Sequence, residues 1–179
     1  MESTRAKTVF YTKTLVVTAF FIALSFIGST IKVFGTIAFD SLPGFLAALL
    51  LGPGYGAAIG FLGHLFTALT SGFPLSVPLH FVIALTMAVT MMGFGLSYRF
   101  LKSRVSMLSN LVVTGVVGTI LNGPVSLTCS ILTVALMAGM EAGLGLLSLL
   151  PVLVLASIAN IVISIILFKS LENVWAKIK

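Results

Sequence analysis

Long uninterrupted apolar runs constrain this sequence more than any other feature. Residues 15–31 and 146–168 are the clearest, and neither run contains a charged side chain. Only 8% of the whole chain is charged, whereas soluble domains carry about 25%. So few charges cannot cover a water-facing surface, so the sequence predicts an integral membrane protein. Barrel strands would alternate apolar and polar residues, and the continuous runs therefore favour helices.

Six apolar segments divide the chain. They cover residues 13–32, 42–51, 55–69, 79–100, 107–140 and 144–171. We therefore predict an all-α integral membrane protein, a six-transmembrane-helix bundle in which residues 1–179 form a single transmembrane domain. The second and third segments are short for a hydrocarbon core of about 30 Å, so they are tilted, buried or partly re-entrant. The fifth is broken by Asn122-Gly123-Pro124, which indicates either one kinked helix or two short ones.

The basic residues predict the orientation. With the N-terminus inside and six spans, the inner ends carry nine of the ten basic residues and the outer side carries only Lys32. Both termini are therefore expected in the cytoplasm. The nine are Arg5, Lys7, Lys13, Arg99, Lys102, Arg104, Lys169, Lys177 and Lys179.

Small residues at helical spacing indicate faces built for close packing. Gly52, Gly56 and Gly60 repeat every four residues, and Ala19 and Ala23 form a similar pair in the first segment. Such spacing lets helix backbones approach each other in lipid. Two interpretations stay open, namely packing within the chain and docking on another membrane subunit.

Polar side chains within apolar runs are the candidate binding residues, because such groups are costly in a membrane and mark functional sites. Asp40 either caps the second helix or faces a ligand, and His64 either bonds a neighbouring helix or contacts a ligand. On the predicted topology Lys32, Asp40, His80 and Glu141 lie toward the outer side, as does the loop from Ser71 to Pro78. This is either an outward-facing pocket or a set of wet helix ends. The candidate pocket residues are Asp40, His64, Thr67, Phe73, His80, Asn122 and Asn160.

Several function classes are excluded by missing motifs. The sequence has no phosphate loop, no His-Glu-x-x-His and no Gly-x-Ser-x-Gly. Two histidines, four acids and the lone Cys129 predict neither a metal centre nor a disulfide, and no cofactor is expected. The net charge of +6 does not indicate nucleic-acid binding, because the basic residues sit at the ends of apolar runs. We predict a protein that is not an enzyme.

A family resemblance rests on several stretches taken together. These are Ala19-x-x-x-Ala23, residues 39–45, Leu51-Gly52-Pro53-Gly54-Tyr55-Gly56, and residues 63–74 from Gly63-His64 to Phe73-Pro74. With the length and six segments, they make the chain resemble the substrate-binding S component of an energy-coupling factor (ECF) vitamin transporter over nearly its whole length. Within that family it looks most similar to members assigned to α-ribazole, a cobalamin precursor, with pantothenate or another vitamin as alternatives.

The resemblance implies a function and partners. The chain would capture a vitamin or vitamin precursor at the outer face of the bacterial plasma membrane and then topple to release it inside. Its partners would be a transmembrane coupling subunit, docked at Ala19 and Ala23, and two ATPase subunits, which explains the missing phosphate loop. Two alternatives remain: a structural or assembly subunit without a small ligand, and an intramembrane enzyme using His64, His80 and Asp40.

Overall fold

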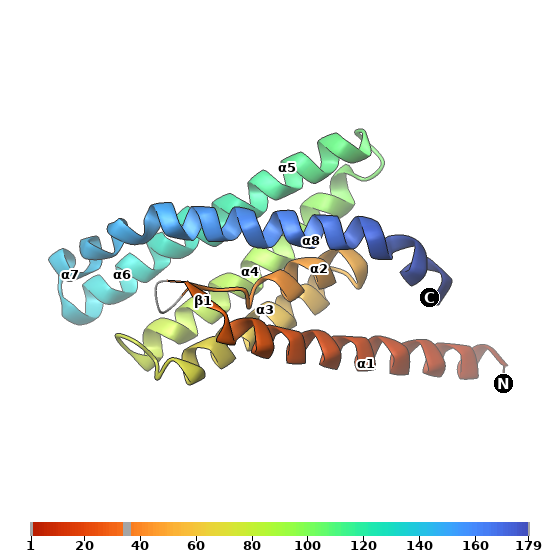
Figure 1. Ribbon diagram of the computed structural model, residues 1–179, viewed down its shortest axis with the longest axis horizontal. Helices are drawn as coiled ribbons and strands as arrows, with labels where there is room; N and C mark the ends of the chain where they lie inside the picture. The colour runs from red at the N-terminus through yellow and green to blue at the C-terminus, as the bar shows by residue number, and fades with distance from the viewer. Residues whose placement is uncertain (1, 34–36, 179) are drawn as a thin grey trace.

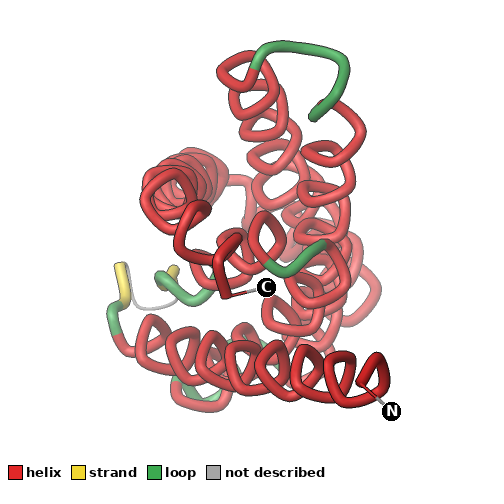
Figure 2. The backbone as a smooth tube through the Cα atoms, turned by 90° about the vertical axis from the view of Figure 1, so that its right-hand side faces the viewer, coloured by secondary structure: helices red, strands yellow, loops and turns green. Residues whose placement is uncertain are grey.

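A computed structural model of the chain describes residues 2–33 and 37–178 and shows them as almost entirely helical (Figure 1; Figure 2). One antiparallel pair of two-residue strands interrupts the helices, with Lys32 opposite Ala38 and Val33 opposite Ile37. In chain order the elements are α1 (Glu2–Thr30), β1 (Lys32–Val33), β2 (Ile37–Ala38), α2 (Leu42–Leu50), α3 (Pro53–Thr70), α4 (Val77–Leu101), α5 (Met107–Ile120), the π-helical turn η1 (Leu121–Val125), α6 (Ser126–Ala138), α7 (Met140–Gly145), the 3-10 turn η2 (Leu146–Leu149) and α8 (Leu150–Ile178).

The predicted all-α class is confirmed apart from this strand pair, and each of the six apolar segments coincides with helix. Four helical stretches of the described chain are long and apolar enough to cross a membrane, namely Tyr11–Thr30, Val77–Leu101, Met107–Ala138 and Met140–Lys177. The nine residues of α2 extend only about 14 Å at 1.5 Å per residue, less than half of the hydrocarbon core. The count of six spans therefore stays a prediction.

Helix α2 forms the centre of the packing. Every residue from Pro43 to Leu50 is buried, and the helix contacts α1, α3, α4 and α8. The Phe45 ring meets the Phe94 ring of α4 edge-on, with centroids 4.9 Å apart. An all-apolar helix covered on every side needs no polar face, which explains why this segment shows no amphipathic pattern.

Glycines allow α3 to approach its neighbours closely. A Cβ atom at Gly56 would lie 2.9 Å from the Cα of Ala48 in α2, and one at Gly60 would lie 3.3 Å from the Met87 carbonyl oxygen in α4. Both glycines are buried. Of the two interpretations of this glycine repeat, packing within the chain is therefore the one that the contacts of Gly56 and Gly60 support.

The fifth segment is one continuous helix that contains a π-helical turn. Pro124 lies inside this turn, and proline has no backbone N–H to donate to the preceding turn. A wider turn absorbs the missing hydrogen bond without ending the helix, as π-bulges commonly do. The break expected at Asn122-Gly123-Pro124 is thus a local widening, and the helix runs on from α5 into α6.

The two termini lie at the same end of the molecule (Figure 1). Figure 2 views the molecule from this end, with α1 crossing the lower part of the picture. Two termini at the same end require the chain to cross the membrane an even number of times. This holds whether α2 and α3 each span the membrane or form a re-entrant hairpin, because a hairpin adds either two crossings or none. The shared end of the termini therefore agrees with the orientation predicted from the basic residues, whether or not α2 and α3 span the membrane.

Candidate functional site

A cavity of about 370 Å³ lies among α4, α6 and α8. Most of its wall is apolar, and the polar groups come from separate elements. The apolar lining includes Leu79, Ile83, Met87, Leu127, Leu146, Leu149 and Leu153, and the polar lining consists of Asp40, Ser41, His64, His80, Asn122, Ser126, Ser130 and Asn160. An apolar wall with a few polar anchors is typical of small-molecule sites.

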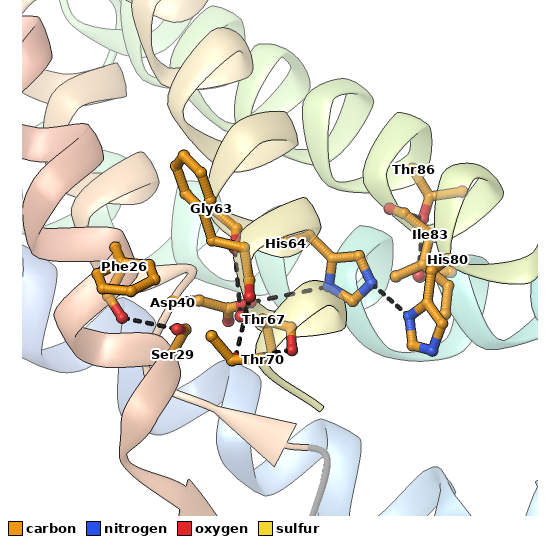
Figure 3. A network of polar contacts seen from close by, with 12 residues as sticks. Phe26, Ser29, Asp40, Gly63, His64, Thr67, Thr70, His80, Ile83 and Thr86 are labelled. Atoms are coloured by element: carbon orange, nitrogen blue, oxygen red, sulfur yellow. Dashed lines mark hydrogen bonds and ion pairs between the residues drawn. The ribbon is translucent and has the colours of Figure 1, made fainter. Parts of the chain in front are cut away.

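Asp40 anchors a polar network at one end of the cavity (Figure 3). The Thr67 hydroxyl donates to its Oδ2 at 2.5 Å, and Nδ1 of His64 lies 3.7 Å from the same oxygen. Burial acts to raise the pKa of the Asp40 carboxyl, but the adjacent His64 and the Thr67 hydroxyl outweigh it, so the pKa lies below its ordinary value. Asp40 precedes α2, and its carboxyl is a buried, paired anion. Its side chain does not cap α2, whose N-cap residue is Ser41.

Two histidines extend the network across the cavity. Nε2 of His64 lies 3.1 Å from Nδ1 of His80, and Nε2 of His80 lies 2.9 Å from the Pro74 carbonyl oxygen. A carbonyl only accepts, so His80 donates to Pro74 through Nε2. When His80 is neutral, its Nδ1 has no proton and accepts from Nε2 of His64. His64 therefore donates through Nε2. Nδ1 of His64 faces the Asp40 carboxylate, and the two residues form an ion pair of zero net charge when both ring nitrogens of His64 carry protons.

The loop between α3 and α4 is held in place by this network. Phe73 and Leu75 adopt left-handed backbone conformations, with φ of 52° and 70°. Such conformations are strained for residues other than glycine and are found at ligand sites. Pro74 and Leu75 line the cavity, and the Phe73 ring packs edge-on against His80 at 5.9 Å between centroids. The loop is thus fixed at the cavity margin by His80.

Two amide side chains, from other elements, also line the cavity. Nδ2 of Asn122 donates to the Ser157 hydroxyl at 2.8 Å, and Nδ2 of Asn160 donates to the Ala156 carbonyl oxygen at 2.9 Å. Asn122 lies in the π-helical turn and Asn160 on α8. The helix contact between these elements therefore brings together residues that are far apart in the sequence.

The structure brings all seven candidate pocket residues into one region. Asp40, His64, His80, Asn122 and Asn160 line the cavity, whereas Thr67 and Phe73 contact lining residues without lining it themselves. No Phe, Tyr or Trp is among the described lining residues, where the two histidines supply the aromatic rings. Sequence reasoning missed Ser126 and Ser130, although both follow Asn122 at four-residue intervals, which is a usable signal once the helix is known to continue.

The predicted docking residues Ala19 and Ala23 lie outside the cavity lining. Ala19 and Ala23 are exposed on α1, on the face opposite the buried Thr14, Thr18, Phe21 and Ser25. Within the described residues, His, Cys, Asp and Glu side chains form no group of three that could hold a metal ion.

Comparison with known proteins identifies the family. The model of the ECF transporter, substrate-specific component family matches residues 13–172 of the chain. The chain therefore belongs to this family of multi-pass membrane proteins, whose members are subunits of ECF importers rather than enzymes. As such a subunit it works with a small-molecule substrate and an ECF energy-coupling module. No curated protein sequence matches the chain.

Proposed function

We propose that this chain binds a vitamin or vitamin precursor in the cavity among α4, α6 and α8, and that the substrate is α-ribazole. The observation that carries the proposal is the cavity itself, where five of the seven residues expected from the sequence meet around an apolar space of about 370 Å³. The α-ribazole assignment rests on the sequence resemblance, and an aromatic base joined to a hydroxylated sugar suits a mostly apolar wall with polar anchors.

Titration calorimetry with α-ribazole tests the substrate. The detergent-solubilised chain is expected to bind it saturably at one site per chain, because the candidate polar residues line one cavity. Absence of binding by protein that unfolds cooperatively would reject α-ribazole as the substrate.

We further propose that both termini are cytoplasmic and that the cavity opens toward the outer side. Nine of ten basic residues support this orientation, as does the common end at which the termini lie (Figure 1). The test is labelling of a single cysteine placed beside Lys177 in Cys129→Ala protein. This cysteine is expected to be protected from a membrane-impermeant reagent in intact cells. Labelling of the cysteine from outside would show that the orientation is the reverse of the proposed one.

The remaining partners follow from the same proposal. Ala19 and Ala23 dock on the transmembrane coupling subunit, and two ATPase subunits supply the energy that this chain, with no phosphate loop in its sequence, does not. Support comes from the exposure of both alanines on α1, where small side chains let a second helix approach closely.

A further inference from the structure

One wall of the cavity carries a row of three polar side chains. Asn122, Ser126 and Ser130 follow each other at four-residue intervals along the continuous helix, and residues at that spacing share a face. All three line the cavity. Their hydrogen bonds within the protein determine what they can offer a ligand.

The hydroxyl groups of Ser126 and Ser130 both donate their protons to other groups of the protein. The Ser130 hydroxyl donates to the Ser126 carbonyl oxygen at 3.0 Å. The Thr86 hydroxyl donates to the Ile83 carbonyl oxygen at 2.8 Å, so its 2.8 Å contact with the Ser126 hydroxyl requires Ser126 to be the donor. Figure 3 shows Thr86 and Ile83 beside His80. Since a hydroxyl has one proton, both serines have only lone pairs left for a ligand.

Asn122 offers an acceptor as well. The Ser157 hydroxyl donates to the Leu153 carbonyl oxygen at 2.7 Å, so the group of Asn122 that faces Ser157 must be the amide nitrogen. Its Oδ1 atom is then buried with no hydrogen-bond partner among the described residues. A buried acceptor without a partner is unfavourable. Because Oδ1 is itself covered, a donor on a ligand would reach it after the Asn122 amide turns toward the cavity.

The cavity also lacks a free positive charge. No Lys or Arg is among the described residues that line it. His64 lies against the Asp40 carboxylate, while both ring nitrogens of His80 are already engaged, one with the Pro74 carbonyl oxygen and the other with His64. An anionic ligand would lose its hydration without gaining a cation and would face a row of acceptors. A cationic ligand would find the one lining carboxylate already paired.

We infer that this cavity selects an uncharged ligand with hydroxyl or N–H donors along one edge, and that it rejects carboxylates and phosphates. The inference rests on the proposed binding function and narrows its substrate class. It disfavours pantothenate, which carries a carboxylate, and accommodates the sugar hydroxyls of a nucleoside such as α-ribazole. The row of Asn122, Ser126 and Ser130 receives those donors.

Calorimetric titration of the full-length chain with two matched pairs of ligands tests whether the cavity prefers uncharged ligands to anionic ones. The pairs are α-ribazole with its 5′-phosphate and pantothenol with pantothenate. In each pair that binds, the uncharged member is expected to bind at least about ten-fold more tightly. Equal or tighter binding of an anionic member would overturn the inference and leave the proposed binding function intact. Binding of none of the four would overturn both.

Variants of the acceptor row test which side chains receive the donors. Asn122→Leu and Ser130→Ala are each expected to weaken binding of the uncharged member about ten-fold or more. Thr128→Ala is the matched control, because its exposed hydroxyl donates to the Pro124 carbonyl oxygen on the same helix. It is expected to bind like wild type. Unchanged affinity in both row variants, with cooperative thermal unfolding retained, would contradict the assignment of donors to this row.

Discussion

Replacing Ala19 and Ala23 together by tryptophan is expected to abolish substrate uptake by the assembled transporter and to leave ligand binding by the isolated chain unchanged. Both alanines are exposed on α1, four residues apart, and neither lines the cavity. Two indole rings there would separate backbones that must nearly touch when a coupling subunit docks. Uptake of radiolabelled substrate into proteoliposomes and calorimetric titration of the solubilised chain measure the two effects separately.

The matched control for this pair is Leu85→Trp with Val89→Trp. These residues are also exposed, apolar and four apart, but they lie on α4. They are expected to retain uptake, because bulk on a lipid-facing surface costs little. Normal uptake by the Ala19 and Ala23 variant, or loss of binding through unfolding, would show that this face of α1 is not the docking surface.

Removing the imidazole of His64 is expected to produce the largest loss of stability among single substitutions in the polar network. Asp40 is 6% exposed, and His64→Ala would leave its carboxylate with the Thr67 hydroxyl as its remaining side-chain partner among the described contacts. Breaking a buried pair by deleting one partner costs about 3–5 kcal/mol. At about 2–4 °C per kcal/mol for a chain of this size, the midpoint of thermal unfolding should fall by roughly 6–20 °C.

A second substitution separates charge from packing. Asp40→Asn together with His64→Ala is expected to recover part of the lost stability, because the uncompensated buried charge is gone. Lys169→Ala is the control, since Lys169 and Glu172 form an ion pair on the surface at 2.6 Å. Exposed pairs contribute only about 0–1 kcal/mol. If His64→Ala lowered the unfolding midpoint no more than Lys169→Ala, the contact between Asp40 and His64 would not act as a buried ion pair.

Helix positions were predictable because they depend on local properties of the sequence. A run of apolar residues bounded by Gly52-Pro53 or by the proline-containing stretch from Ser71 to Pro78 identifies a helix without knowledge of its neighbours. The covered position of α2 was not predictable in the same way. Its residues look like those of a lipid-facing helix, and the environment of an apolar side chain depends on which other helices surround it.

The composition of the candidate site was also partly predictable. Polar residues in apolar runs are few, and this rarity was sufficient to select Asp40, His64 and Asn160 as candidates. The chain of contacts from Thr67 through Asp40 and His64 to His80 was not foreseeable, because it joins the residue before α2 with α3 and α4. The left-handed backbone at Phe73 and Leu75 likewise depends on how Pro74 meets His80.

The most direct test of the proposed binding site is calorimetric titration of the bound substrate, α-ribazole in the first instance, into His80→Ala, Asp40→Asn and Asn160→Ala. These residues approach the cavity from three separate elements, and each supplies a buried hydrogen-bonding group. Loss of one such partner should cost about 1–3 kcal/mol, a drop in affinity of roughly ten- to hundred-fold. Wild-type affinity in all three variants, with each protein folded, would place the binding site outside this cavity.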